Sequence, residues 1–176
     1  MVSLSYSEHK SRAFGDVRFG IVTCSSSRSE ALRRGDVVVD ESGDLSVSIV
    51  TRSGFQVRYR KLVSDDIFDI RYSIVEAAKR GVDILVLIGG TGVSPTDVTV
   101  EALKPLMDRE IPGFGELFRK ISFEEIGSGA MLSRAFACIA EGMIVFALPG
   151  SPHAVALALE KLIIPEARHL ILHLKR

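Results

Sequence analysis

Two different hydrophobic periods alternate along the chain. Apolar residues dominate four short segments, 18–24, 83–88, 135–139 and 143–147, and they alternate with polar residues through 55–61. A short, mostly apolar run is typical of a strand covered on both faces of a sheet, and alternation is typical of a strand with one exposed face. We therefore expect these five segments to form strands.

Apolar residues three or four positions apart predict helices between most of these strands. The predicted helices span about 40–54, 65–81, 98–107, 114–121 and 153–162, and a last helix begins near Pro165. Pro105 is expected to bend the third of them, because proline cannot donate a backbone hydrogen bond. Residues 25–28 are expected to form a turn.

Strands that alternate with helices imply an α/β fold with a mainly parallel sheet, because parallel strands need crossover connections. The short connection at Glu141 and Gly142 suits one antiparallel pair instead. A chain of 176 residues fits a single domain, which we place at 17–176. The polar residues 1–16 are expected to form an N-terminal arm.

Composition excludes several classes of protein. Hydrophobic residues make up 47% of the chain, which excludes intrinsic disorder. Lys plus Arg and Asp plus Glu both number 22, so the net charge is zero, which argues against a nucleic-acid-binding protein and permits self-association. The N-terminus lacks a signal-peptide segment, and prolines interrupt the longest uncharged run, 142–159. We therefore expect a soluble, cytoplasmic protein with no membrane or nucleic-acid partner.

Cysteine and histidine residues form no catalytic set that their order alone would identify. Cys24 and Cys138 lie far apart in apolar segments, so small buried side chains are expected rather than a disulfide. His169 and His173 are four residues apart and either share a metal or complement a helix dipole. His153 is expected beside a pocket.

The segment after the strand at 83–88 combines glycines with hydroxyl side chains. Three glycines allow an anion to approach the backbone closely, and the hydroxyls of Thr91, Ser94 and Thr96 add donors. The segment is neither a Walker A loop nor G-x-G-x-x-G, because Pro95 stands in place of the third glycine. It is either an anion or phosphate site or a tight turn with no ligand.

Three aspartates pose a choice between a structural and a chemical role. Asp97 either caps the helix that follows it or binds Mg²⁺, which prefers one or two carboxylates together with phosphate oxygens. One of Asp65 and Asp66 is expected to cap the next helix, which leaves the other free for a metal or a substrate.

In open α/β sheets, ligands bind beyond the carboxyl ends of the strands. Four polar or glycine-rich loops fall there, at 25–28, 64–66, 89–97 and 149–152. The last is either a plain strand-to-helix turn or part of a pocket. The hydroxyl-rich segment 127–133 leaves the same alternatives open.

Four motifs in this order resemble those of a known family. They are GGTGxxPxDVT at 89–99, IPGFGE at 111–116, AMLSRA at 130–135 and LPGSP at 148–152. The set is similar to the molybdenum-cofactor biosynthesis family of MoaB and Mog proteins, which includes molybdopterin adenylyltransferase. The resemblance covers nearly the whole chain, and Glu8-His9-Lys10 resembles the arm of the MoaB-like branch.

The resemblance implies a three-layer α/β/α sandwich and a homotrimer, paired into a homohexamer in some members. It also implies that Mg²⁺ and ATP are used to activate molybdopterin in molybdenum or tungsten cofactor biosynthesis. The terminal phosphate of molybdopterin attacks the α-phosphorus of ATP, adenylyl-molybdopterin forms and pyrophosphate leaves. Such a transfer depends on alignment and charge neutralisation more than on a strong base.

By the same resemblance, Asp65 and Asp97 are the two catalytic aspartates, which bind Mg²⁺ and align the attacking phosphate. Asp40 is expected to be a further metal ligand. The residues expected to bind the pterin, the phosphates or the nucleotide are Gly89, Gly90, Thr91, Gly92, Ser94, Ser133, Pro149, Gly150, Ser151, Ser25, Ser27, Arg28, Ser42, Gly43 and Glu116. Arg119 and Ser122 are expected to complete the pocket.

Several positions depart from the family pattern. Ile88 stands where a threonine often precedes the glycines, and Thr96 where an arginine often precedes the aspartate. A hydroxyl and a cation that would face the triphosphate are therefore missing. Ser26 replaces a frequent acidic residue, and Ser64 replaces a usual proline.

These departures leave a second function open, a scaffold of the same pathway that binds molybdopterin without adenylylating it. A third function is an unrelated nucleotide or sugar-phosphate enzyme on the same type of sheet, since a fold does not fix a function. The partners expected from the resemblance are the small-molecule substrates, further copies of the chain and other proteins of cofactor biosynthesis.

Overall fold

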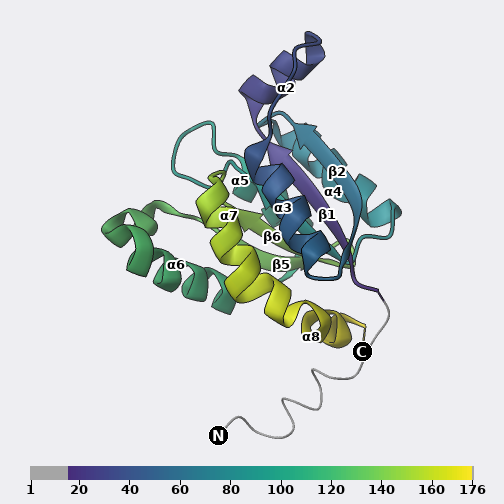
Figure 1. The fold of residues 1–176 in the computed structure, drawn as a ribbon, viewed down its shortest axis with the longest axis vertical. Coiled ribbons are helices and arrows are strands. Elements are labelled where there is room, and N and C mark those ends of the chain that lie inside the picture. The colour runs from purple at the N-terminus through teal and green to yellow at the C-terminus, as the bar shows by residue number, and fades with distance from the viewer. Residues whose placement is uncertain (1–15, 176) are drawn as a thin grey trace, which may run out of the picture.

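The computed structural model describes residues 16–175 and centres on one six-stranded sheet (Figure 1). The strand order is β2-β1-β3-β6-β5-β4. The strands are β1 Arg18–Cys24, β2 Gln56–Val63, β3 Ile84–Ile88, β4 Met107–Glu110, β5 Phe136–Ala140 and β6 Met143–Leu148. β2, β1, β3 and β6 are mutually parallel, whereas β5 is antiparallel to both β6 and β4. The predicted mainly parallel sheet and the antiparallel hairpin at Gly142 are confirmed.

Helices cover both faces of the sheet and complete a three-layer sandwich. The helices are α2 Ser26–Arg33, α3 Glu41–Arg52, α4 Ile67–Lys79, α5 Thr99–Leu103, η1 Lys104–Leu106, α6 Pro112–Ile126, η2 Gly127–Leu132, α7 Pro152–Ala158, η3 Leu159–Ile163 and α8 Ile164–Leu174. Buried side chains of α3, α6, α7 and α8 pack on one face of the sheet. Those of α4 and α5 pack on the other face.

The central strand β3 explains why its sequence is apolar without interruption. Ile84, Val86 and Ile88 point into the core beneath α3, α6 and α7. Leu85 and Leu87 point into the core beneath α4 and α5. All five side chains are fully buried, because successive side chains of a strand face opposite sides of the sheet.

The predicted turn at 25–28 is wrong, because residues 26–33 form the helix α2. Only Ser29 of this helix is buried, so its sequence carries no apolar stripe that would predict it. Contacts from another loop hold its start, since the carboxylate of Asp65 accepts a hydrogen bond of 2.7 Å from the Ser26 N–H. A helix stabilised in this way cannot be read from local sequence.

The sequence analysis predicts no strand where β4 lies, and it predicts a helix at 98–107 that is shorter in the structure. The α-helix ends at Leu103, a 3₁₀ turn containing Pro105 follows, and Met107 is already extended. β4 lies at the edge of the sheet and is largely exposed, so its sequence MDRE shows no strand-like alternation.

The two predicted C-terminal helices are continuous in the structure. A π-helical segment, Leu159–Ile163, joins α7 to α8, so Pro165 lies in the first turn of α8 rather than after a break. The predicted arm at 1–16, including Glu8-His9-Lys10, lies outside the described residues except for Asp16. No helix within residues 16–175 is long and apolar enough to cross a membrane.

Candidate active site

The loops that follow β3 and β6 meet at the carboxyl edge of the sheet. The Gly89 N–H donates a hydrogen bond of 2.9 Å to the Leu148 carbonyl, and a Cβ on Gly150 would lie 3.5 Å from the Gly89 Cα. The Ser42 hydroxyl at the start of α3 donates to the Gly150 carbonyl at 2.6 Å. The edge where the sequence predicts ligand binding is therefore built from backbone segments in direct contact.

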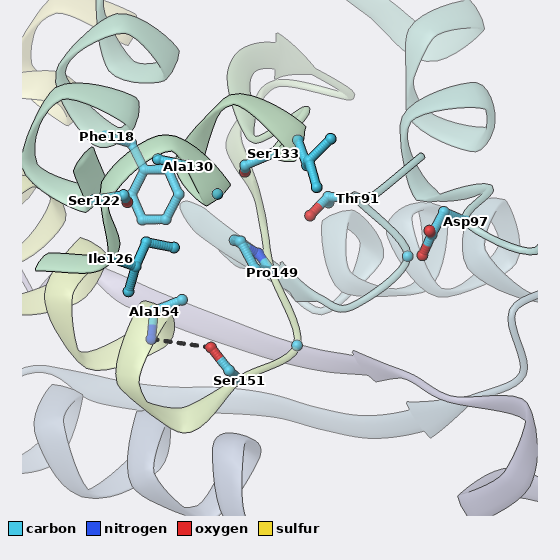
Figure 2. Close-up of a pocket in the computed structure, with 15 residues that line it drawn as sticks. Thr91, Asp97, Phe118, Ser122, Ile126, Ala130, Ser133, Pro149, Ser151 and Ala154 are labelled. Atoms are coloured by element: carbon cyan, nitrogen blue, oxygen red, sulfur yellow. Dashed lines mark hydrogen bonds between the residues drawn. The ribbon is translucent and has the colours of Figure 1, made fainter. Parts of the chain in front are cut away.

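A pocket of about 340 Å³ opens beside these loops (Figure 2), and we call it the Thr91 pocket. Its lining residues are Gly90, Thr91, Gly92, Asp97, Phe118, Ser122, Ile126, Gly129, Ala130, Leu132, Ser133, Pro149, Gly150, Ser151 and Ala154. Figure 2 shows Thr91 and Asp97 on one side and Phe118 and Ile126 on the other. The pocket thus has a polar wall from the glycine loop and an apolar wall from α6 and η2.

Two glycines give the polar wall its shape. Gly89 and Gly90 have φ values of 104° and 63°, in the left-handed region where L side chains are strained. A Cβ on Gly89 would lie closer than 3.0 Å to the Cys24 carbonyl oxygen, and one on Gly90 would lie equally close to Thr99 Oγ1. The segment is thus a tight turn, and the same turn forms the wall of a pocket.

The strongest sign of a ligand is the side chain of Thr91. This residue is 2% exposed, yet its hydroxyl has no hydrogen-bond partner within residues 16–175. The backbone N–H groups of Gly90, Thr91 and Gly92 likewise donate to nothing in the described part of the chain. An unpaired buried polar group costs about 1–3 kcal/mol. A bound anion would satisfy such donors.

Asp97 does not cap the helix that follows it. Val98 occupies the N-cap position of α5 and makes no side-chain cap. Asp97 Oδ2 instead accepts a hydrogen bond of 2.8 Å from the Ser94 N–H and closes the loop on itself. Its Oδ1 has no hydrogen-bond donor within the described residues. Of the two roles that the sequence left open, the capping role is therefore excluded.

Of the adjacent residues Asp65 and Asp66, one caps a helix, as the sequence predicts. Asp66 caps α4 by accepting from the N–H groups of Phe68 and Asp69 at 2.8 and 3.0 Å. Asp65 Oδ2 accepts from both the N–H and the hydroxyl of Ser26, at 2.7 and 3.0 Å. An ionised acidic side chain at position 26 could not donate the second of these bonds, which comes from the Ser26 hydroxyl. Asp65 is not among the residues that line the Thr91 pocket.

Asp40 is held by the protein itself. It is 7% exposed, and its Oδ2 accepts from the Thr23 hydroxyl at 2.7 Å and from the Arg60 guanidinium at 2.6 Å. Its Oδ1 accepts from the Gly43 N–H at 3.2 Å, which caps α3. Both oxygens are therefore engaged, and the expected role of Asp40 as a metal ligand stays a prediction.

The other predicted binding residues lie at different places relative to the Thr91 pocket. The pocket-lining residues are Gly90, Thr91, Gly92, Ser122, Ser133, Pro149, Gly150 and Ser151. Gly89 lies buried behind that wall, and Ser94 lies exposed in the loop that Asp97 closes. The residues at the starts of α2 and α3, outside this lining, are Ser25, Ser27, Arg28, Ser42 and Gly43.

Glu116 and Arg119 line a different cavity. It has a volume of about 310 Å³, and Arg134 and Lys104 also line it. Arg119 donates to the Ala135 carbonyl at 3.1 Å. The structure therefore separates these two residues from the pocket that they were expected to complete.

Sequence reasoning missed two parts of the site. Phe118, Ile126 and Leu132 form the apolar wall. Phe118 follows the helical stripe of core residues, and Leu132 lies in a separate 3₁₀ segment, so no periodic pattern joins the three. Arg134 lies within the motif at 130–135, yet nothing in its spacing shows that it binds the glycine loop. Its Nε donates to the Gly92 carbonyl at 2.6 Å, and its Nη2 donates to the Asp97 carbonyl at 2.8 Å.

The cysteines and the histidines of the last helix supply no nucleophile or metal site at the carboxyl edge of the sheet. Both cysteines are free and buried, as predicted, and burial raises the pKa of each thiol to about 12. They are therefore poor nucleophiles, because the thiolate is the reactive form. His169 lies 2.9 Å from both Glu166 and His173, but residues 16–175 hold no cluster of three metal-binding side chains.

Comparisons with known proteins agree on one family. A family model described as "Probable molybdopterin binding domain" matches residues 20–169. Molybdenum cofactor biosynthesis protein B of Bacillus cereus is 43% identical over 175 residues, which cover 98% of this chain and 99% of that protein. A Pyrococcus furiosus protein named molybdopterin adenylyltransferase is 39% identical over 170 residues, covering 94% of this chain and 96% of that protein.

Solved structures show the same relationship. The crystal structure of the tungsten cofactor synthesizing protein MoaB from Pyrococcus furiosus matches with a TM-score of 0.84 at 37% identity, covering 93% of this chain and 100% of that chain. A crystal structure of a molybdenum cofactor biosynthesis protein B matches with a TM-score of 0.84 at 42% identity, covering 94% and 99%. With its fold and its matched domain, the chain belongs to the MoaB/Mog family of molybdenum-cofactor biosynthesis proteins.

Proposed function

We propose that this protein is a molybdopterin adenylyltransferase, which uses Mg²⁺ and ATP to convert molybdopterin into adenylyl-molybdopterin. The observation that carries the proposal is the buried, unpartnered hydroxyl of Thr91 in a pocket that also contains Asp97. A phosphate oxygen would accept from this hydroxyl. The relative from Pyrococcus furiosus carries the name of this enzyme at 39% identity, which supports the same conclusion.

The two walls of the Thr91 pocket suit the two ends of molybdopterin. The flat pterin ring would lie against the apolar wall that includes Phe118, Ile126 and Leu132. The phosphate would face Thr91 and the free N–H groups of the glycine loop. Its oxygen attacks the α-phosphorus of ATP, the new P–O bond forms, and the bond to pyrophosphate breaks. The protein contributes alignment and hydrogen-bond donors rather than a covalent intermediate.

The two predicted catalytic carboxylates each keep one oxygen available for a magnesium ion that is shared with phosphate oxygens. Asp65 and Asp97 each accept hydrogen bonds at Oδ2, from Ser26 and Ser94 respectively, while Oδ1 has no donor within residues 16–175. Mg²⁺ commonly uses one or two carboxylates and completes its shell with phosphate and water. Asp65 and Asp97 would hold the ion, which neutralises charge on the triphosphate. That contribution matters here because Thr96 supplies no cation.

An assay with purified molybdopterin, ATP and Mg²⁺ tests this function. We expect pyrophosphate release and adenylyl-molybdopterin only when all three are present. Asp97→Asn should lower turnover at least 100-fold without unfolding the protein, because the amide oxygen can still accept from the Ser94 N–H. Asp108→Asn, on exposed β4, is the matched control and should leave turnover unchanged.

The same assay separates the enzyme from a scaffold. Molybdopterin binding without pyrophosphate release would support the non-catalytic alternative, and unchanged turnover in Asp97→Asn would remove Asp97 from the mechanism. Binding of a different nucleotide or sugar phosphate in place of molybdopterin would contradict both. The metal that is finally inserted, molybdenum or tungsten, does not enter this step.

The proposal also includes a homo-oligomer, a trimer or a pair of trimers, in the cytoplasm where ATP is supplied. Large apolar side chains that do not line the Thr91 pocket are exposed on α6 and η2, namely Leu117, Phe123 and Met131. Exposed apolar clusters of this kind are typical of protein interfaces. Light scattering coupled to size exclusion tests the state, and a monomer at micromolar concentration would contradict it. Other cofactor-biosynthesis proteins are further candidate partners.

A further inference from the structure

Arg134 binds the glycine loop of the Thr91 pocket from behind. It lies between η2 and β5, and its backbone N–H donates to the Thr91 carbonyl at 2.9 Å. Its guanidinium donates to the Gly92 carbonyl at 2.6 Å and to the Asp97 carbonyl at 2.8 Å. One residue thus holds three carbonyl groups of the same loop.

The two guanidinium bonds hold both ends of the exposed loop segment 93–96. Residues 93–96 are exposed, whereas the carbonyls of Gly92 and Asp97 lie at the two ends of that stretch. The side chains that face the pocket, Thr91 and Asp97, belong to the residues whose carbonyls Arg134 holds. Movement of Arg134 would therefore move both groups on which the proposed chemistry depends.

Glu101 on α5 orients the guanidinium. Both of its carboxylate oxygens contact Arg134, at Nη1 and at Nη2. Arg134 is not among the residues that line the Thr91 pocket, and its side chain lines the neighbouring cavity that contains Glu116. Its charge is therefore paired with Glu101 and lies behind the loop, where it does not face a ligand of the pocket.

We infer that Arg134 is a positioning residue, which holds the loop 91–97 in the shape that presents the Thr91 hydroxyl and the Asp97 carboxylate to molybdopterin phosphate. This inference builds on the proposed function of the Thr91 pocket. The planar guanidinium matters because its donors diverge toward two carbonyls at once, whereas the lysine ammonium is a single point of charge. The role is therefore one of geometry rather than of charge.

Steady-state kinetics of Arg134→Gln and Arg134→Lys test the inference, with Arg109→Gln on exposed β4 as the control for loss of a positive charge. We expect both Arg134 variants to lower kcat roughly 10- to 100-fold, since misplacing a group by about 1 Å can cost 100-fold. They should also raise the Mg²⁺ concentration needed for half-maximal activity. Glu101→Gln should have a smaller effect in the same direction, because the bonds to the two carbonyls remain.

A double-mutant cycle with Asp97→Asn distinguishes positioning from a general structural role. If Arg134 acts through Asp97, adding Arg134→Gln to the Asp97→Asn variant should lower kcat by less than a further threefold. Additive losses would overturn the inference. So would full activity in Arg134→Lys, which would indicate a charge effect, or a higher KM for molybdopterin with unchanged kcat.

Amide hydrogen exchange gives a readout that does not require activity. In Arg134→Gln, faster exchange should be confined to about residues 90–99, including the Asp97 N–H that is bonded to the Ser94 carbonyl. Unchanged exchange in this loop would contradict the inference even if the wild type were only a binding protein. If Arg134→Gln does not fold, the same exchange measurement on Glu101→Gln and Arg134→Lys decides the matter.

Discussion

The side-chain hydroxyl of Thr99 donates a hydrogen bond of 2.7 Å to the carbonyl of Gly89, ten residues earlier in the chain. The Thr99 N–H also donates to the Gly90 carbonyl, at 3.1 Å. The first residue of α5 therefore closes the loop that begins at the end of β3. Because Thr99 is fully buried, no water replaces this bond when the hydroxyl is lost.

Thr99→Val should destabilise the protein by about 1–2 kcal/mol, because it leaves the buried Gly89 carbonyl without its donor. Urea unfolding followed by circular dichroism measures the change. Thr99→Ser keeps the hydroxyl and should lose less than half as much. Equal losses in the two variants would show that packing of the methyl group, and not the hydrogen bond, carries the effect.

Gly90→Ala should abolish molybdopterin binding. The new Cβ would enter a residue with φ of 63° and collide with Thr99 Oγ1, so the loop must change its path. Gly54→Ala is the matched control, because Gly54 also has a positive φ, 80°, but has open space around it. The control should cost about 1 kcal/mol of stability and leave binding intact. Retained binding in Gly90→Ala would separate the loop shape from ligand recognition.

Thr91→Val should separate stability from binding. Valine has nearly the same shape and removes a buried hydroxyl that has no partner within the described residues, so the free energy of unfolding should stay constant or rise by about 0.5–1 kcal/mol. Molybdopterin affinity should fall about tenfold, since one hydrogen bond to a charged group is lost. Calorimetry measures the affinity, and an unchanged dissociation constant would show that the hydroxyl does not meet the ligand.

Asp83 makes stability depend on acidic pH. Burial acts to raise its pKa, but hydrogen bonds from Arg18 and Lys175 outweigh it and lower the pKa to about 2. A carboxylate with a lowered pKa in the folded state stabilises the protein above its unfolded pKa of about 4 and loses that contribution as pH falls toward 2. The contribution amounts to about 2 kcal/mol.

The unfolding free energies of wild type and Asp83→Asn, measured from pH 5 to pH 2, test this contribution. The variant should be less stable at pH 5, and the difference should shrink by about 2 kcal/mol at pH 2. Asp108→Asn removes an exposed carboxylate and should follow the wild-type pH profile. A constant difference between wild type and Asp83→Asn would mean that Asp83 contributes through packing alone.

The parts of the fold that are visible in the sequence are those where local pattern and tertiary contacts agree. β3 is apolar throughout because both faces of the sheet are covered. The sequence does not predict α2, because Asp65 from another loop holds its start. It does not predict β4 either, because β4 is an exposed edge strand without an alternating pattern. Their stability comes from partners far away in the chain.

The same distinction applies to the site. The glycine loop and the turn at 149–151 are recognisable because their residue types are contiguous. The apolar wall from α6 and the hydrogen bonds from Arg134 to the glycine loop depend on how separate elements pack, and no spacing rule predicts them. The placement of Glu116 and Arg119 in the neighbouring cavity depends on the same packing.

The hydrogen bond from Ser42 to the Gly150 carbonyl has a consequence for attempts to change which ligand is accepted. It joins the turn at 149–151 to the buried start of α3, and the bond from Gly89 to Leu148 joins the end of β6, directly before that turn, to the glycine loop. Redesign of this half would disturb the core of the domain. On the opposite wall Phe118 also belongs to the core, but Ile126 and Leu132 are 60% and 55% exposed. Libraries that aim at altered pterin preference therefore belong at those two positions.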